Sequence, residues 1–462
     1  MSTIKVDKIE KRSGSTLTLG GACTAVTLAP GATQSGFGRA GAVDWCTTAK
    51  TSPFTATSGS GFFVNTTSGG ITVTLPASPS AGDIVAIVDY AGTAASQNIT
   101  IGRNGSNING SASCLTINKG DSGITLVYVD GTEGWKNTET SNINDITLTP
   151  EFIVATGGTI TTSGDFKIHT FNSDSTFSVS TAGNETGSNT VDYLVIAGGG
   201  GGGGNVGGGG GAGGYRFSNG TASGCYSAGP APLGASAVPV SVQGYPVTVG
   251  GGGAGGTSNP QRGTSGTNSV FSAITSTGGG GGGTFSGAPG CSTGRTGGSG
   301  GGGGSFDCTA AAPNRGQAGA GNTPPVSPPQ GNNGGAGGIE PGPPGAYPSG
   351  GGGGAGAVGS SGTACGASPR VSGAGGTGLT SCISASPVTR GGGGGGASGS
   401  SGTQGAGGSG GGGAGAKFPS NPASVAGTAN TGGGGGGGDS GTSASDGATG
   451  GSGVVIIRYK FQ

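Results

Sequence analysis

Short stretches in which apolar residues alternate with polar ones fill the first part of the chain. In Ile71-Thr-Val-Thr-Leu75 every second side chain is apolar, whereas residues 83–90 and 124–129 are apolar almost throughout. Alternation with a period of two, and short apolar runs between turn residues, both predict β-strands. Turn signals recur roughly every 8–12 residues, a spacing typical of a β-sandwich or small barrel. Because no stretch of this region keeps a helical period, we expect an all-β fold with essentially no α-helix.

The same pattern continues from about residue 146 to residue 197 and returns at the C-terminus. Residues 166–171 and 177–180 place apolar side chains on one face of a strand, and residues 191–197 lead directly into seven glycines. Residues 454–461 give the strongest strand signal of the C-terminal part. One strand therefore enters the glycine-rich region and one leaves it, so we expect the two strands to pair and clamp its ends.

The glycine content rises sharply after about residue 190. The chain has 120 Gly among 462 residues, against a usual share of about 7%. Most of them lie in the second part, in runs such as 198–204, 278–283, 391–396 and 432–438. An ordered glycine costs more backbone entropy than any other residue and buries no side chain, so we expect no large apolar core and no ordinary single-domain enzyme there. Collagen is excluded, because Gly does not recur at every third position over a long span.

A glycine run is either a flexible linker or a polyglycine II helix, which has three residues per turn and no internal hydrogen bonds. Helices of the second kind satisfy their N–H and C=O groups by packing side by side, and only glycine lets the backbones approach closely enough. Low charge, several runs of similar length and a strong strand after the last run favour packed polyglycine II helices.

These patterns divide the chain into five parts. We expect N-terminal strands at 1–40, a β module at 41–140 and a second β module at 141–197. A polyglycine II domain with variable loops follows at 198–453, and a closing strand occupies 454–462.

Charge and candidate chemistry add few constraints. Residues 1–192 carry ten Lys/Arg and fifteen Asp/Glu, and residues 193–462 carry nine and four, with no dense basic stripe typical of nucleic-acid binding. His169 is the only histidine, so a Ser-His-Asp or Cys-His arrangement has almost no candidates. Asp121, Asp130 and Glu133 lie among turn residues and are expected to cap turns; a glycosidase pair is the alternative. Gly-x-Gly-x-x-Gly matches are frequent, but none ends in the Gly-Lys-Ser/Thr of a phosphate-binding loop. We therefore expect no enzyme and no cofactor.

The eight cysteines and the apolar stretches bear on metal binding and on where the protein is made. No two cysteines stand at Cys-x-x-Cys spacing, so no zinc or other metal site is expected, and synthesis in a reducing cytosol favours free thiols over disulfides. No apolar stretch approaches the ~18 residues of a membrane span. The N-terminus lacks the apolar segment of a signal peptide. We expect synthesis in the cytoplasm and no membrane insertion.

Several segments, taken in order, resemble a known family. The segments are Ser2-Thr-Ile-Lys-Val-Asp-Lys-Ile, Gly14-Ser-Thr-Leu-Thr-Leu19, residues 62–67, 75–83 and 128–136, Val191-Asp-Tyr-Leu-Val-Ile-Ala-Gly-Gly-Gly, residues 269–271 and 275–280, and Gly450-Gly-Ser-Gly-Val-Val-Ile-Ile-Arg-Tyr459. The segments of the glycine-rich part are similar to the glycine-rich domain of bacteriophage tail fibres and distal adhesins. Those of the N-terminal part resemble structural proteins of phages of marine cyanobacteria.

The resemblance implies a homotrimeric fibre of the virion, with the N-terminus bound to other tail proteins and the glycine-rich part distal. In relatives, loops between polyglycine II helices bind the host receptor. The long Pro-rich connection at 322–348 departs from that pattern, so the regularity of the lattice near it is not assured.

Rigid aromatic side chains and arginines in exposed loops are the favoured contact residues of a binding surface. Each of them could instead pack its loop onto the glycine lattice. The stretch 305–347 is long enough to protrude, and deleting residues 306–347 is expected to leave the fold intact. The connections offer Tyr215, Phe217, Tyr226, Phe285, Phe306, Arg315, Tyr347, Arg370 and Arg390, of which we select Phe306, Arg315, Tyr347 and Arg370 as receptor-binding residues.

Together these inferences predict a non-enzymatic phage tail-fibre protein that recognises a bacterial surface glycan or outer-membrane protein. One alternative is a purely structural virion fibre, collar or capsid appendage. Another is ice binding, although irregular connections argue against it.

Overall fold

The computed structural model divides the chain into two compact units, Met1–Leu148 and Thr149–Gln462. Within the described residues the chain has no helix and consists of strands and extended runs, which confirms the expected all-β class. The strands expected at 1–40 lie outside the described residues. The structure describes residues 43–140, 146–220, 222, 234–257, 261–285, 290–307, 316–340, 345–363, 369–419, 422–439 and 446–462.

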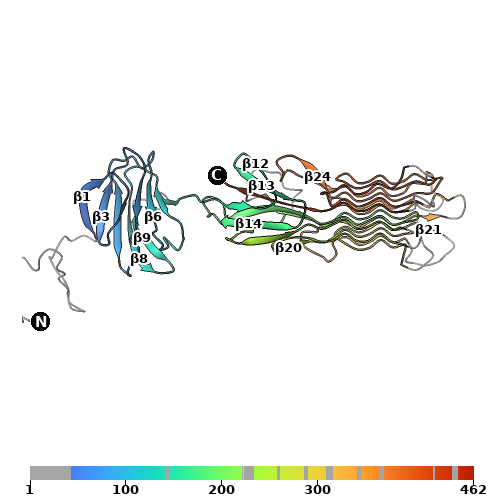
Figure 1. Cartoon of the computed structure of the whole chain (residues 1–462), viewed down its shortest axis with the longest axis horizontal. Coiled ribbons are helices and arrows are strands. Elements are labelled where there is room, and N and C mark those ends of the chain that lie inside the picture. Colours follow the sequence, from blue (N-terminus) through green and yellow to red (C-terminus); the bar gives the residue numbers. More distant parts are fainter. Residues whose placement is uncertain are drawn as a thin grey trace, which may run out of the picture. The chain divides into compact units, whose positions relative to one another are not determined.

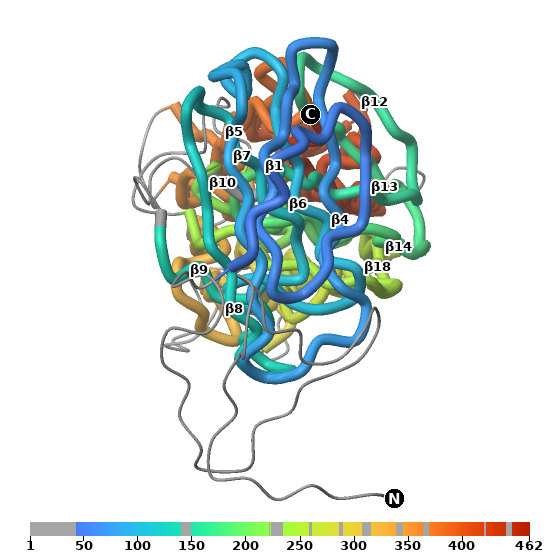
Figure 2. The backbone as a smooth tube through the Cα atoms, turned by 90° about the vertical axis from the view of Figure 1, so that its left-hand side faces the viewer, coloured from blue at the N-terminus to red at the C-terminus, as the bar shows by residue number. Residues whose placement is uncertain are grey.

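The first unit contains two β-sheets in its described part. Sheet 1 has the strand order β1-β3-β5-β8-β9, and sheet 2 has the order β10-β7-β6-β4-β2. Figure 2 shows β10, β7, β6 and β4 following one another across the view in that order. The strands are β1 (Asp44–Lys50), β2 (Phe54–Thr55), β3 (Ser60–Val64), β4 (Ile71–Thr74), β5 (Ile84–Asp89), β6 (Ile99–Gly102), β7 (Leu115–Ile117), β8 (Gly123–Asp130), β9 (Gly134–Thr140) and β10 (Ile146–Leu148).

The chain alternates between the two sheets over its first six strands. β1, β3 and β5 pair in parallel in sheet 1, and β2, β4 and β6 pair in parallel in sheet 2. Parallel neighbours need a long crossover, and here each crossover is a strand of the opposite sheet. β7 to β10 then add antiparallel pairs to both sheets. The unit is therefore a β-sandwich in which three successive strand pairs (β1–β2, β3–β4 and β5–β6) each contribute one strand to either sheet, and antiparallel strands complete both sheets.

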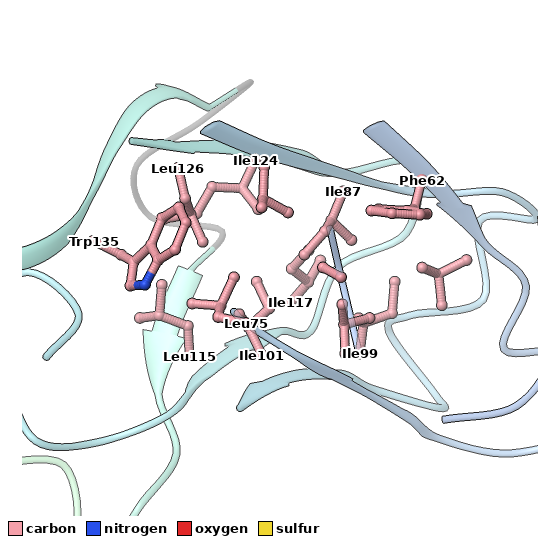
Figure 3. Close-up of a cluster of buried hydrophobic side chains, with 14 of the residues drawn as sticks. Phe62, Leu75, Ile87, Ile99, Ile101, Leu115, Ile117, Ile124, Leu126 and Trp135 are labelled. Atoms are coloured by element: carbon pink, nitrogen blue, oxygen red, sulfur yellow. The ribbon is translucent and has the colours of Figure 1, made fainter. Parts of the chain in front are cut away.

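The core of this unit lies between the two sheets. Figure 3 shows Phe62, Ile87 and Leu126 of sheet 1 facing Ile99 and Leu115 of sheet 2. Along β4, Ile71 and Val73 are buried while Thr72 between them is exposed, as the alternating sequence pattern predicts.

The second unit begins with two further sheets, of order β11-β14-β18-β19-β20 (sheet 3) and β12-β13-β25-β15-β16 (sheet 4, with β17 paired to β15) in the described part. β15 and β25 pair antiparallel, with Ile196 opposite Val454, so the expected clamp at the ends of the glycine-rich region is confirmed. The strands are β11 (Val154–Thr156), β12 (Thr159–Ser163), β13 (Phe166–Phe171), β14 (Ser175–Thr181), β15 (Thr190–Ile196), β16 (Tyr215–Phe217), β17 (Val238–Pro239), β18 (Gly244–Thr248), β19 (Ser269–Phe271), β20 (Ile274–Ser276), β21 (Phe306–Asp307), β22 (Ile339–Glu340), β23 (Leu379–Ser381), β24 (Val388–Arg390) and β25 (Val454–Lys460).

Sheet 4 is covered on both faces, which explains why β15 and β25 are apolar almost throughout. Val191, Tyr193 and Val195 join one buried cluster, together with side chains of sheet 3. Leu194 and Ile196 join a second cluster on the opposite face. The two central strands thus anchor the glycine runs in apolar packing.

Beyond the sheets, the glycine runs lie side by side as wavy, extended traces (Figure 1). Their hydrogen bonds repeat with a period of three. In run 198–204, the N–H groups of residues 198, 201 and 204 donate to run 261–267. Those of residues 199 and 202 donate to run 446–451, and those of residues 200 and 203 donate to run 207–211, all at 2.9–3.2 Å. Each run therefore faces several neighbours at once, unlike a β-strand, which has two.

The run 207–213, here called the central run, has six neighbours among the described residues. It donates to three runs and accepts from three others, so no N–H of the run lacks an acceptor. The neighbours that accept are runs 432–438, 278–283 and 349–354, and those that donate are 198–204, 299–304 and 391–397.

Runs at the periphery carry glycine at the positions that face inward. In run 261–267 these are Gly263 and Gly266, and a Cβ there would lie 2.1 and 2.2 Å from the carbonyl oxygens of Gly201 and Gly198. Thr264, Ser265 and Thr267 point outward and are exposed. In this outer run glycine is therefore needed only at every third position, whereas the central run, which has neighbours on all sides, needs a small residue at each position.

The stretch 305–347 does not form the protruding surface that we expected. Residues 316–322 and 330–337 are lattice runs: Gly334 N donates to Gly319 O at 3.0 Å, and Gly337 N donates to Gly316 O at 2.7 Å. The Pro-rich composition was misleading, because the described prolines at 324–329 lie in a turn while glycines or small residues face the neighbouring runs. Deleting residues 306–347 would remove two hydrogen-bonded runs, so we now expect this deletion to disrupt the fold, contrary to the expectation from the sequence.

Candidate functional site

The runs end in turns, and the turns away from the sheets form what we call the tip. In Figure 1 β21 lies at this end, opposite β14, β20 and β24. The tip is organised around the tight turn of Asn205 and Val206, which have positive φ angles of 47° and 50°. The carbonyl of Asn205 accepts from Phe285 N at 3.0 Å, and that of Val206 accepts from Ser349 Oγ at 2.6 Å. Turns distant in sequence are thus fixed to one another.

Tyr347, one of the four selected residues, lies at the tip and is half-buried. Its ring packs edge-on against Phe285, with the ring centroids 5.3 Å apart and the planes at 71°. Its backbone has φ of 40°, a conformation that side chains rarely adopt. Gly345 and Gly399 leave room for the ring, because a Cβ at either would lie within 3.0 Å of a ring carbon. The lattice therefore holds this aromatic pair in place.

Phe306 lies in the neighbouring turn, in β21, which pairs in parallel with β22 so that Phe306 is opposite Ile339. The ring is half-buried and covers Gly316, where an added Cβ would lie 2.6 Å from two ring carbons. The next residue before it, Ser305, donates its N–H to Val206 O at 3.4 Å. Phe306 and Tyr347 thus belong to turns that are bound to the same residue.

Arg370 is also half-buried, and its carbonyl accepts from Thr403 N at 3.0 Å. Ser372, two residues later, accepts at Oγ from Ser349 N at 3.2 Å, so the runs that follow Tyr347 and Arg370 are adjacent. Arg315 and Tyr226 lie outside the described residues.

The structure adds Phe285 to the selected set and removes others from consideration. Phe285 was among the aromatic candidates, but only its contact with Tyr347 distinguishes it. Tyr215 and Phe217 are buried in the apolar cluster at the sheet end, and Arg390 ends β24 beside it. A sequence signal existed for Phe285, since it is the second residue after the unbroken glycine run 278–283.

His169 has a structural role. It is fully buried, its Nδ1–H donates to Gly157 O at 2.7 Å, and its Nε2 accepts from the Tyr459 hydroxyl at 3.2 Å. Burial lowers the pKa of His169 and raises the pKa of Tyr459 to about 12. The pair is therefore neutral at physiological pH.

Of the acidic residues singled out in the first unit, Asp130 caps a turn and Glu133 is in an ion pair. Asp130 Oδ1 accepts from the N–H groups of Thr132 and Glu133 at 2.8 Å each, as expected for a turn cap. Glu133 forms an ion pair with Lys136. Cys46, Cys114, Cys291 and Cys382 are free thiols. The described residues hold no cluster of potential metal ligands, and none of them forms a helix suited to crossing a membrane.

Comparison with known proteins identifies the second unit. No curated protein matches the chain in sequence. A family described as the glycine-rich domain matches residues 172–460, which is well over half of the chain and includes the clamp strands β15 and β25, the glycine runs and the tip. The match begins before β14 and ends at the last residue of β25, so it covers the clamp and the lattice together but not β12 and β13 of sheet 4. The chain therefore belongs to the glycine-rich domain family.

Proposed function

We propose that this chain is a non-enzymatic receptor-binding protein of a bacteriophage tail fibre and that the tip of its glycine-rich unit contacts the bacterial surface. The observation that carries the proposal is the separation of roles within that unit. Apolar sheets anchor one end, a hydrogen-bonded body of glycine runs spans the middle, and turns of diverse sequence gather at the other end. Rigid scaffolds that present variable loops are the usual architecture of recognition surfaces.

We further infer that the glycine runs are polyglycine II helices. The period of three in their hydrogen bonds is the period of that helix, and each run bonds to its neighbours and not to itself. A body of this kind gives the tip a stiff support without an apolar core.

The tip residues suit contact with a glycan or an outer-membrane protein. Phe285, Phe306 and Tyr347 are half-buried aromatics, and Arg370 adds a cation. Aromatic side chains and arginines held by packing lose little entropy when they bind a partner, which is why they dominate binding energies.

In this proposal the N-terminal residues attach the chain to other tail proteins and the assembled fibre is a homotrimer in the virion. The first unit buries its apolar faces between its own two sheets. Trimerisation is therefore not needed to complete that core, and the trimer is proposed from the family resemblance alone.

A cell-binding assay tests the proposal. Fluorescently labelled full-length protein is added to a panel of bacterial strains, and bound protein is measured for the wild type, Tyr347→Ala and Phe306→Ala. Tyr90→Ala is the matched control, because Tyr90 is an exposed aromatic of the first unit, 58% accessible. We expect binding to a subset of strains, loss with the two tip variants and no change with the control. Binding to no strain at all would favour a structural virion component.

A further inference from the structure

Run 278–283 has partner runs on only five of its six sides among the described residues. The side between runs 261–267 and 292–298 carries no run, although both flanking runs bond to 278–283. The five bonded neighbours are runs 198–204, 207–213, 261–267, 292–298 and 299–304.

The N–H groups that point to this open side belong to residues 278, 281 and 284, because the bonding pattern repeats every three residues. Gly278 N donates to Asn268 Oδ1 at 3.0 Å, and Thr284 N donates to Cys291 O at 2.9 Å. Gly281, between them, is buried, yet its N–H has no acceptor among the described residues. A buried backbone N–H without a partner is rare in proteins, so this position indicates a missing acceptor.

Two arginines meet at the same side. Arg295 donates its backbone N–H to Gly281 O at 2.8 Å, and its Nε donates across to Gly263 O at 3.0 Å. Arg262 directly precedes Gly263, and its Nε is buried with no hydrogen-bond partner. Burial and the charge of Arg295 lower the pKa of Arg262. Neither guanidinium forms an ion pair with a described residue.

The site thus offers the N–H of Gly281 and two guanidinium groups on adjacent runs, and no carboxylate of a described residue pairs with either guanidinium. We propose that Arg262, Arg295 and the Gly281 N–H bind an oxyanion group (sulfate, phosphate or carboxylate) carried by an acidic polysaccharide of the bacterial surface. Guanidinium groups bind such oxyanions with strong, charge-assisted hydrogen bonds. The polysaccharide as the source of the anion rests on the proposed receptor-binding function.

The test measures binding of defined anions to the full-length protein by calorimetry. The probes are dextran sulfate, neutral dextran of the same length and inorganic sulfate. The variants are Arg262→Gln and Arg295→Gln, and Arg216→Gln is the matched control, since Arg216 lies in β16 at the sheet end and its loss changes the net charge equally. We expect dextran sulfate to bind and neutral dextran not to bind. Each test variant weakens the dextran sulfate affinity by about tenfold or more, and the control leaves it unchanged.

Two results would overturn the proposal. Dextran sulfate binding that is absent, or that Arg262→Gln and Arg295→Gln leave unchanged, removes the site. Inorganic sulfate binding that depends on both arginines, without dextran sulfate binding, refutes the polysaccharide as source. If Arg262→Gln fails to fold, Arg295→Gln still tests the site, because Arg295 is exposed. Cell binding is a separate measurement, so adhesion that persists without anion binding refutes this site and leaves the tip proposal standing.

Discussion

Replacing a single glycine of the central run tests whether the lattice is packed as closely as described. At Gly210 an alanine Cβ would lie 2.0 Å from the carbonyl oxygen of Gly200, whereas ordinary contact begins at 3.4 Å. The backbone would have to move by about 1.4 Å. Gly200 O accepts from Gly435 N, and Gly210 itself bonds to runs on either side, so such a shift disrupts several bonds at once.

The magnitude follows from two contributions. Overpacking of a tight interior costs about 1–3 kcal/mol, and a buried backbone group left without its partner costs about 1–3 kcal/mol more. The lower chain entropy of alanine in the unfolded state returns about 0.4–1 kcal/mol. We therefore expect Gly210→Ala to lower the free energy of unfolding of the second unit by about 1–5 kcal/mol.

Gly251 provides the matched control, because it lies in a glycine run but faces solvent. An added Cβ would find only Thr267 Oγ1 at 3.9 Å, and Gly251 has no positive φ angle. Gly251→Ala is expected to leave stability unchanged or to raise it by up to about 1 kcal/mol.

Calorimetric unfolding of both variants is the assay. The only two tryptophans, Trp45 and Trp135, lie in the first unit, so their fluorescence identifies the transition of that unit and serves as an internal reference. Equal stabilities for Gly210→Ala and Gly251→Ala would refute the close packing of the runs.

Three further predictions use other parts of the molecule. The folded-state pKa of His169 is lowered, so the unfolded chain binds more protons below about pH 6.5 and the second unit loses stability as the pH falls through that value. His169→Gln should reduce this slope in pH-dependent melting, and an unchanged slope would contradict the assignment. Ile101→Ala should lower the free energy of unfolding of the first unit by about 2–5 kcal/mol in tryptophan-detected denaturation. Thr72→Ala should lower it little, because Thr72 is the exposed residue of β4. Similar losses for the two variants would contradict the sandwich core. Amide exchange across residues 198–204 should be slow, and exchange as fast as in an unfolded peptide would identify these residues as a linker.

The sequence by itself determined several of the apolar or alternating strands and which strands enclose the glycine region. Alternation in Ile71-Thr-Val-Thr-Leu75 and the apolar stretches at 191–197 and 454–461 act locally, because a strand must bury one or both faces. The matching apolar strands on either side of the glycine runs therefore sufficed to predict the pairing of β15 with β25.

The tertiary structure alone decided which residues form the lattice and which form the tip. The runs 261–267, 316–322 and 330–337 contain no long unbroken stretch of glycine, and they become recognisable only when the carbonyl groups facing each inward glycine are known. The contact of Phe285 with Tyr347 and the meeting of Arg262 with Arg295 likewise depend on the order in which the runs pack. Glycine has no side chain to specify a neighbour, so the partners of each run depend on the connections and the register of the whole unit.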